Sequence, residues 1–149
     1  MPATPMLDPD PRVAAAQLAA VADDRPAGWL DEVAEALDAR RGGDALDRVL
    51  DVWGLSQAEA GRLFGVSRQA VAKWVAAGLP AERTPAVADL AGATDLLVRY
   101  LQRDRIPAVV RRPAEALAGR SLLDLVADGD TAGVLEACRA MFDVYGAHA

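Results

Sequence analysis

One segment, residues 56–76, constrains the fold of this chain more than any other part of the sequence. Ser56 and Glu59 stand three residues apart, which is the spacing of a capping box at the start of a helix. Gly65 follows after about two helical turns, at a point where a sharp turn needs a residue that tolerates positive φ. Ser67 then offers a second helix cap. The segment therefore predicts two short helices joined by a tight glycine turn.

The apolar residues of the segment agree with this prediction, because they fall on the inner faces of the two helices and at the turn. They are Ala60, Phe64, Val66, Ala70, Val71 and Trp74. Gly61 is small at the point where the two helices must cross closely. Two helices joined in this way are typical of a helix-turn-helix, here covering roughly Leu55 to Ala77.

The second helix of this motif has an outward arc that suits DNA. The arc is formed by Ser67, Arg68, Gln69, Ala72, Lys73 and Ala76. Arginine binds guanine and glutamine binds adenine through paired hydrogen bonds, and the methyl group of Ala72 suits a thymine methyl. Lys73 is placed to reach phosphate, as are Ser67 and the amides of the helix N-terminus. The sequence therefore predicts double-stranded DNA as a partner, and a structural helical corner is the alternative.

Helical spacing dominates the rest of the chain, and no segment shows convincing period-two alternation, so we predict an all-α fold. Further helices are predicted at 13–22, from Pro26 to the Gly42–Gly43 pair, at 45–53, from the cap Thr84 with Pro85 to about 102, at 121–127, and from the cap Asp130 onward. We expect three parts. They are an acidic helical extension at 1–44 whose first ten or so residues are mobile, the helix-turn-helix at 45–83, and a linker helix with a C-terminal module at 84–149.

The helix predicted from Pro85 to Gln102 carries apolar residues on two faces. Leu96 and Tyr100 lie roughly opposite the main apolar stripe of this helix. Related DNA readers place two recognition helices about one turn of DNA apart, which requires two copies. We therefore predict a homodimer with Leu96 and Tyr100 at its interface.

The charge distribution separates the middle of the chain from its ends. The whole chain has a net charge of −6, but residues 56–83 have a net charge of +2 and residues 99–112 one of +4. Local charge sets the attraction for phosphate. The two basic islands are therefore compatible with DNA binding, although ordinary solvated charge explains the second island equally well.

Composition excludes several function classes. A single cysteine, Cys138, rules out an intramolecular disulfide and a cysteine-based zinc cluster, and it fits a reducing cytoplasm. We see no signal peptide and no apolar run long enough to span a bilayer. The only histidine, His148, stands next to the last residue, and the acidic residues around 124–130 lack EF-hand spacing. We therefore expect no catalytic site, no metal and no cofactor.

The C-terminal half adds a family resemblance. The stretch Gln57–Trp74 resembles the Xre-type helix-turn-helix, and residues 99–142 resemble the toxin-binding region of the Xre/MbcA/ParS antitoxins. The second likeness rests on Pro113, on the element GRSLLDL at 119–125, and on Gly129-Asp130 leading into a final helix. The resemblance covers about residues 45–145. Leu122 stands where the family often has proline, and the first 44 residues are an extension atypical of it.

This resemblance implies an antitoxin that binds its operator as a dimer. It also implies that the C-terminal module neutralises a RES-domain toxin that consumes NAD. Arg120 and Ser121 are candidate contacts with the toxin, although they also suit a helix stop and the next helix cap. Phe142 and Tyr145, near the end of the final helix, are either core residues or aromatic anchors for the partner. Two other interpretations stay open, a stand-alone transcriptional regulator and a protein-interaction adaptor that no longer binds DNA.

Overall fold

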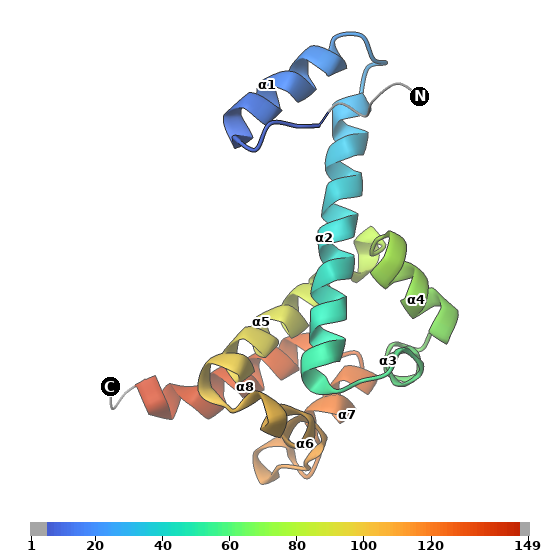
Figure 1. Cartoon of the computed structure of the whole chain (residues 1–149). Coiled ribbons are helices and arrows are strands. Elements are labelled where there is room, and N and C mark those ends of the chain that lie inside the picture. The colour runs from blue at the N-terminus through green and yellow to red at the C-terminus, as the bar shows by residue number, and fades with distance from the viewer. Residues whose placement is uncertain (1–5, 147–149) are drawn as a thin grey trace. The chain divides into compact units, whose positions relative to one another are not determined.

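The computed structural model describes the backbone of residues 6–146 and the side chains of residues 6–143. The described residues are helical and form no strand, which confirms the all-α prediction. The helices are α1 (Pro11–Ala22), α2 (Trp29–Trp53), α3 (Gln57–Phe64), α4 (Arg68–Ala77), α5 (Thr84–Tyr100), α6 (Ile106–Arg111), α7 (Leu122–Ala127) and α8 (Thr131–Gly146) (Figure 1). Three short 3-10 turns connect them, η1 (Ala81–Arg83), η2 (Arg103–Arg105) and η3 (Glu115–Leu117).

The chain divides into two units, Met1–Leu37 and Asp38–Ala149. In the first unit Asp10 caps α1 by accepting a hydrogen bond from the backbone N–H of Arg12, and no residue of α1 is buried. The helix predicted to begin at Pro26 begins at Trp29, because Pro26 lies in the preceding turn and its carbonyl accepts from the Trp29 N–H. None of residues 6–37, the part of this unit that the structure describes, is buried, so its helices have no closed core of their own.

The prediction that Gly42 and Gly43 end a helix is wrong, because α2 continues through both to Trp53. The reason is packing against α4. A Cβ atom at Gly43 would collide with the backbone carbonyl oxygen of Trp74, and one at Gly42 would come within 2.9 Å of the Leu79 side chain. The backbone N–H of Leu79 also donates to the carbonyl of Ala39 at 2.8 Å. The two glycines therefore let the end of α4 approach α2.

The largest apolar cluster joins the C-terminal part of α2 to α5, α6, α7 and α8. Helix α5 packs extensively against α8, and the two lie side by side (Figure 1). Trp53, the last residue of α2, is fully buried, and its indole N–H donates a hydrogen bond of 2.9 Å to Thr94 Oγ1 of α5. That hydroxyl in turn donates to the carbonyl of Leu90. Both polar groups are therefore satisfied inside the core, and they fix the register of α2 on α5.

A second apolar cluster lies beneath α3 and α4. Its buried members are Leu46, Leu50, Ala60, Val71, Trp74, Leu79 and Val87. Leu55 and Phe64 pack against both clusters. Helices α3 and α4 therefore share a continuous interior with helices α5 to α8 in the second unit.

The beginning of α5 differs from the prediction that Thr84 caps it. Thr84 is itself helical, with φ −57° and ψ −45°, because η1 runs directly into α5. Arg83 occupies the capping position, and no side chain forms a capping hydrogen bond there. Pro85 still stands in the first helical turn, where its missing N–H costs nothing.

The acidic residues between α7 and α8 serve the helix ends. Asp124 completes a capping box with Ser121, Asp128 pairs with Arg120 at 2.9 Å, and Asp130 accepts from the N–H of Gly133 at 2.9 Å. The predicted helix at 121–127 and the capping role of Asp130 are confirmed. Capping and ion pairing thus account for these carboxylates.

Candidate nucleic-acid and protein interfaces

The first helix of the motif begins as predicted. The Ser56 hydroxyl accepts from the Glu59 N–H at 3.1 Å, and the Glu59 carboxylate accepts from the Ser56 N–H at 2.8 Å. The backbone hydrogen bond from Ser56, followed by that from its hydroxyl and by the charge of Arg111, lowers the pKa of Glu59 below its ordinary value. Glu59 is thus held ionised in the capping box at the start of α3.

The turn between α3 and α4 depends on two glycines. Gly65 adopts a left-handed conformation with φ 68° and ψ 33°, which favours a residue without a Cβ atom. Gly61 lies in the crossing itself, since a Cβ atom there would stand 2.8 Å from the carbonyl oxygen of Val66. The backbone N–H of Val66 donates to the carbonyl of Gly61 at 2.8 Å. The predicted crossing at Gly61 and the turn at Gly65 are therefore present.

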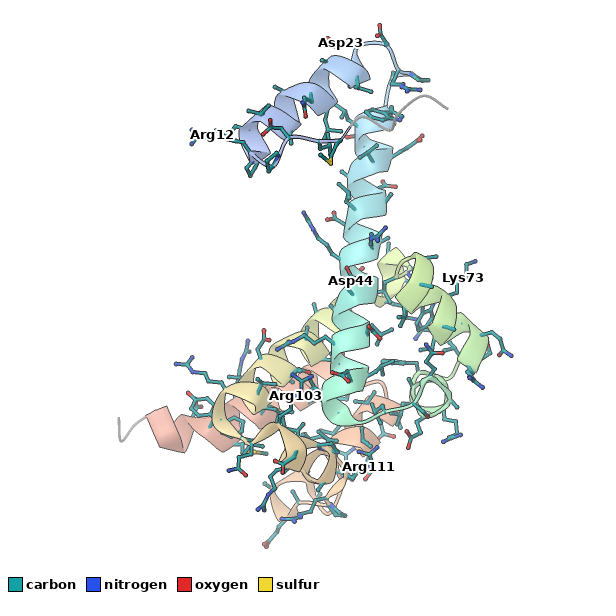
Figure 2. All side chains as sticks on the ribbon, in the orientation of Figure 1. Arg12, Asp23, Asp44, Lys73, Arg103 and Arg111 are labelled. Carbon is teal, nitrogen blue, oxygen red and sulfur yellow. The ribbon has the colours of Figure 1, made fainter. Side chains whose placement is uncertain are left out.

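The outward surface of α4 carries the residues predicted to read DNA. Ser67, Arg68, Gln69 and Lys73 are exposed, and Ala72 is half-buried. The Ser67 hydroxyl accepts from the Ala70 N–H at 3.0 Å, so it caps the helix. Lys73 projects from α4 into solvent (Figure 2). We name Arg68, Gln69, Ala72 and Lys73 the recognition face. Within residues 38–149, the three polar side chains of this face are exposed to solvent.

The recognition face rests on an aromatic support that sequence reasoning missed. The rings of Phe64 and Trp74 meet edge to face, 6.3 Å apart. Arg83 places its guanidinium 5.2 Å from the centre of the Trp74 ring and donates to the carbonyl of Phe64. In the sequence, Arg83 is only one of the positive charges of the basic segment 56–83. No local pattern pairs it with Trp74, because the contact depends on η1 folding back over α4.

Two arginines of the second basic island bind the end of α2. Arg103 pairs with Asp51 at 2.5 Å. Arg111, which Figure 2 labels, lies near the end of α2. It donates to the carbonyls of Trp53 and Gly54, each at 2.9 Å, and lies 3.7 Å from Glu59. Carbonyls at a helix C-terminus lack helical partners, and a cation there also complements the helix dipole. Sequence reasoning did not assign these roles.

The residues predicted to contact a toxin are mostly engaged within the chain. Ser121 is 4% exposed, and its hydroxyl accepts from the Asp124 N–H, so the structure makes it a buried cap. Phe142 is also 4% exposed, which contradicts its prediction as an exposed anchor and agrees with the core alternative. Arg120 stays half-exposed beside Asp128. The side chain of Tyr145 lies outside the described residues, as does His148.

The predicted dimer residues on α5 differ from each other. Leu96 is half-buried against the larger apolar cluster. Tyr100 is 40% exposed, and its ring stacks on Phe142 with centres 4.6 Å apart. Helices of the same chain therefore cover both faces of α5 in part, and Tyr100 keeps an exposed edge.

The C-terminal module also carries an apolar hollow of about 290 Å³. It is lined by Ala114, Ala116, Leu117, Ala137, Ala140 and Met141. Met141 is 40% exposed at this site. The nearby turn after η3 contains Ala118 at φ 56°, the only described residue other than glycine with positive φ.

Cys138 lies on α8, as Met141 does, and it is buried. Burial raises the pKa of its thiol to about 11 and keeps the thiol protonated.

Comparison with solved structures identifies a relative of this architecture. A chain in the crystal structure of the M. tuberculosis MbcT–MbcA toxin–antitoxin complex superposes with a TM-score of 0.57 and 28% sequence identity. The match covers 68% of this chain and 93% of that chain. The resemblance to MbcA-type antitoxins is confirmed.

No family model matches the chain, and no curated protein matches it either. Among the described residues, no helix is both long and apolar enough to cross a membrane.

Proposed function

We propose that this protein is a DNA-binding antitoxin that neutralises a RES-domain, NAD-consuming toxin and represses its own operon. The observation that carries the proposal is the uncovered recognition face on a chain that resembles MbcA-type antitoxins. The similarity itself supports an antitoxin role. Binding to operator DNA and the identity of the toxin belong to the proposal.

The DNA half of the proposal rests on what the recognition face offers chemically. Arg68 and Gln69 stand in the first turn of α4, exposed and without an ion pair among the described residues. The N-terminal residues of a recognition helix contact base edges, and both side chains form paired hydrogen bonds with purines. Lys73, one turn further on, supplies a charge for phosphate.

The toxin half rests on the C-terminal module. Arg120 and the apolar hollow beside Met141 are the exposed features there that suit a protein partner. A partly exposed methionine adapts its shape to a partner, and a charged residue at the edge of an apolar site adds specificity. We propose this surface, rather than Ser121 or Phe142, as the toxin contact.

The dimer remains part of the proposal, because a single short recognition helix gains few specific contacts. The exposed edge of Tyr100 and the half-buried Leu96 form the α5 surface that a second copy would cover. Light scattering at micromolar concentration, with and without operator DNA, tests this. A monomer under both conditions would refute it.

DNA binding is tested with a duplex of the sequence upstream of the gene and a random duplex of equal length. Arg68→Ala and Gln69→Ala should each cost about 1–3 kcal/mol of specific binding, because each removes a paired contact with a base. Lys73→Ala should weaken binding to both duplexes and reduce the salt slope by about one. Folded variants that all bind as the wild type does would refute the DNA half.

Neutralisation is tested by co-expression with a RES-domain toxin encoded beside the gene, or with MbcT where no such gene exists. The wild type should restore growth and cellular NAD. Arg120→Glu should abolish this rescue and leave DNA binding unchanged, because its side chain lies on the surface. Failure of the intact protein to bind or neutralise either toxin would refute the toxin half.

A stand-alone transcriptional regulator is the second candidate. The observation that favours it is the internal use of Ser121 and Phe142, two residues predicted to contact a toxin. This candidate shares the recognition face and differs only in lacking a toxin. The adaptor alternative is separated from both by the same DNA-binding measurements.

A further inference from the structure

The second basic island stands out on an acidic protein. Residues 99–112 hold five arginines and one aspartate, whereas the whole chain has a net charge of −6. Such a concentration of positive charge on a surface repels itself unless carboxylates or a bound anion offset it. The fate of each arginine in the fold therefore shows which of them are available for a partner.

Three of these arginines, Arg99, Arg103 and Arg111, are occupied within the chain. The guanidinium of Arg99 lies 5.5 Å from the centre of the Tyr100 ring. Arg103 pairs with Asp51, and Arg111 binds carbonyls at the end of α2 and lies near Glu59. Arg105 and Arg112 differ from them. They stand immediately before and after α6, both are exposed, and among the described residues neither has an ion pair. No ion pair within the described residues therefore offsets their charges.

Helix α6, which these two arginines flank, contacts the residues that lead into α3. Pro107 of α6 packs at the corner between α2 and α3, where a Cβ atom on Gly54 would come within 3.2 Å of it. Arg111, at the other end of α6, reaches the Gly54 carbonyl and the Glu59 carboxylate in the first turn of α3 (Figure 2). The last residue of α6 thus reaches the first turn of α3 through its side chain.

That end of α3 is where a bound duplex presents its backbone. In a helix-turn-helix the first helix crosses the sugar–phosphate backbone while the second enters the major groove. The carboxylate of Glu59 would repel a phosphate there, but Arg111 stands 3.7 Å away and offsets its charge. The surface next to the start of α3 therefore presents positive charge to the backbone.

We propose that Arg105 and Arg112 contact backbone phosphates of the duplex that the recognition face reads. This inference rests on the DNA half of the proposed function. Phosphate is the ligand because each unpaired arginine releases condensed counterions when it neutralises a phosphate, and the guanidinium fork matches phosphate oxygens. Each such contact adds about 0.9 to the slope of log affinity against log salt. Phosphates carry no base information, so these arginines strengthen binding without adding sequence preference.

The test is a salt titration with the upstream duplex and the random duplex as probes. Arg105→Gln/Arg112→Gln should reduce the salt slope by about 1.8 on both duplexes. If the affinity extrapolated to 1 M salt is unchanged, the smaller slope corresponds to about a 60-fold loss of affinity at 0.1 M salt. The ratio of specific to random binding should stay constant. Arg12→Gln/Arg139→Gln removes the same charge from α1 and α8 and should leave the slope unchanged.

Three outcomes overturn the inference. Suppose that Lys73→Ala lowers the salt slope but Arg105→Gln/Arg112→Gln keeps the slope of the wild type. The inference then fails and the proposed function stands. If the double variant binds DNA normally but no longer binds the toxin, the island is a protein interface. If the wild type binds neither duplex, the DNA half of the proposed function fails as well. Equal melting temperatures of the two double variants establish that both are folded.

Discussion

The helix-turn-helix and the α7–α8 region begin with the same local device and use it differently. Each starts with a serine capping box, Ser56 with Glu59 in one and Ser121 with Asp124 in the other. In the helix-turn-helix the cap and the turn position α4 so that its recognition face is exposed. In the C-terminal region Ser121 is buried, and the predicted anchor Phe142 lies in the core.

This difference teaches that a motif with good local geometry does not reveal which side its residues face. The helix-turn-helix is defined by its turn, so its outward arc follows once the two helices are in place. The C-terminal element is defined by how it packs on α3 and α5. Its residues are therefore first of all structural, and an interface there must use what packing leaves exposed.

The largest expected effect tests whether the two regions share one interior. Phe142→Ala should destabilise the protein by about 3–5 kcal/mol, because it removes a buried ring that also stacks on Tyr100. The loss should appear in one unfolding transition of residues 38–149, since the apolar clusters meet at Leu55 and Phe64. Calorimetry measures this. Two separate transitions, with that of the helix-turn-helix unaffected, would show that the two regions unfold as independent modules.

The next effect tests the support of α4 by α2. Gly43→Ala should cost about 1–3 kcal/mol, because the added methyl group meets the rigid backbone carbonyl of Trp74. Gly42→Ala is the matched control, and it should cost less because the added methyl group meets the Leu79 side chain and no backbone atom. Urea denaturation with tryptophan fluorescence compares the two. Equal costs would mean that α4 shifts freely, and that the recognition face is less firmly held than we infer.

A smaller effect compares the two caps directly. Ser67→Ala and Ser121→Ala should each cost about 1 kcal/mol of stability, because each leaves a helix N–H without its partner. Only Ser67→Ala should also weaken DNA binding, since Ser67 is exposed next to Arg68. Thermal melts and a binding titration on both variants check this. Weaker DNA binding by Ser121→Ala, at full folding, would place the C-terminal region in the DNA interface.

The smallest effect is the pH dependence of the two capping boxes. Backbone hydrogen bonds lower the pKa of Glu59 and of Asp124 below their ordinary values of 4.5 and 3.8. A carboxyl group whose pKa is lowered on folding stabilises the protein above its unfolded pKa, and the gain is lost as the pH falls through the folded value. Stability should therefore decline below about pH 5. Glu59→Gln and Asp124→Asn should each flatten this decline in acid unfolding curves, and a decline unchanged in both would assign it to other carboxylates.

Local chemistry made much of the fold predictable. The capping serines, the left-handed Gly65 and the close crossing at Gly61 each follow from the conformational preferences of single residues within a few positions of one another. The absence of period-two alternation indicated the all-α class, because this alternation is also a local pattern along the chain. The exposure of Arg68, Gln69 and Lys73 followed from helical periodicity once α4 was bounded.

Only the tertiary structure decided what depends on distant residues. The local sequence at Gly42 and Gly43 predicts a helix stop, yet both lie inside α2. The reason is that the chain packs on them at Trp74 of α4 and at Leu79, which follows α4. Arg83 and Arg111 looked like ordinary surface charge until η1 and α6 brought them to Trp74 and to the end of α2. Sequence periodicity determines which residues share a helix face, but burial and pairing are set by contacts between segments far apart in the chain, and those contacts exist only in the folded protein.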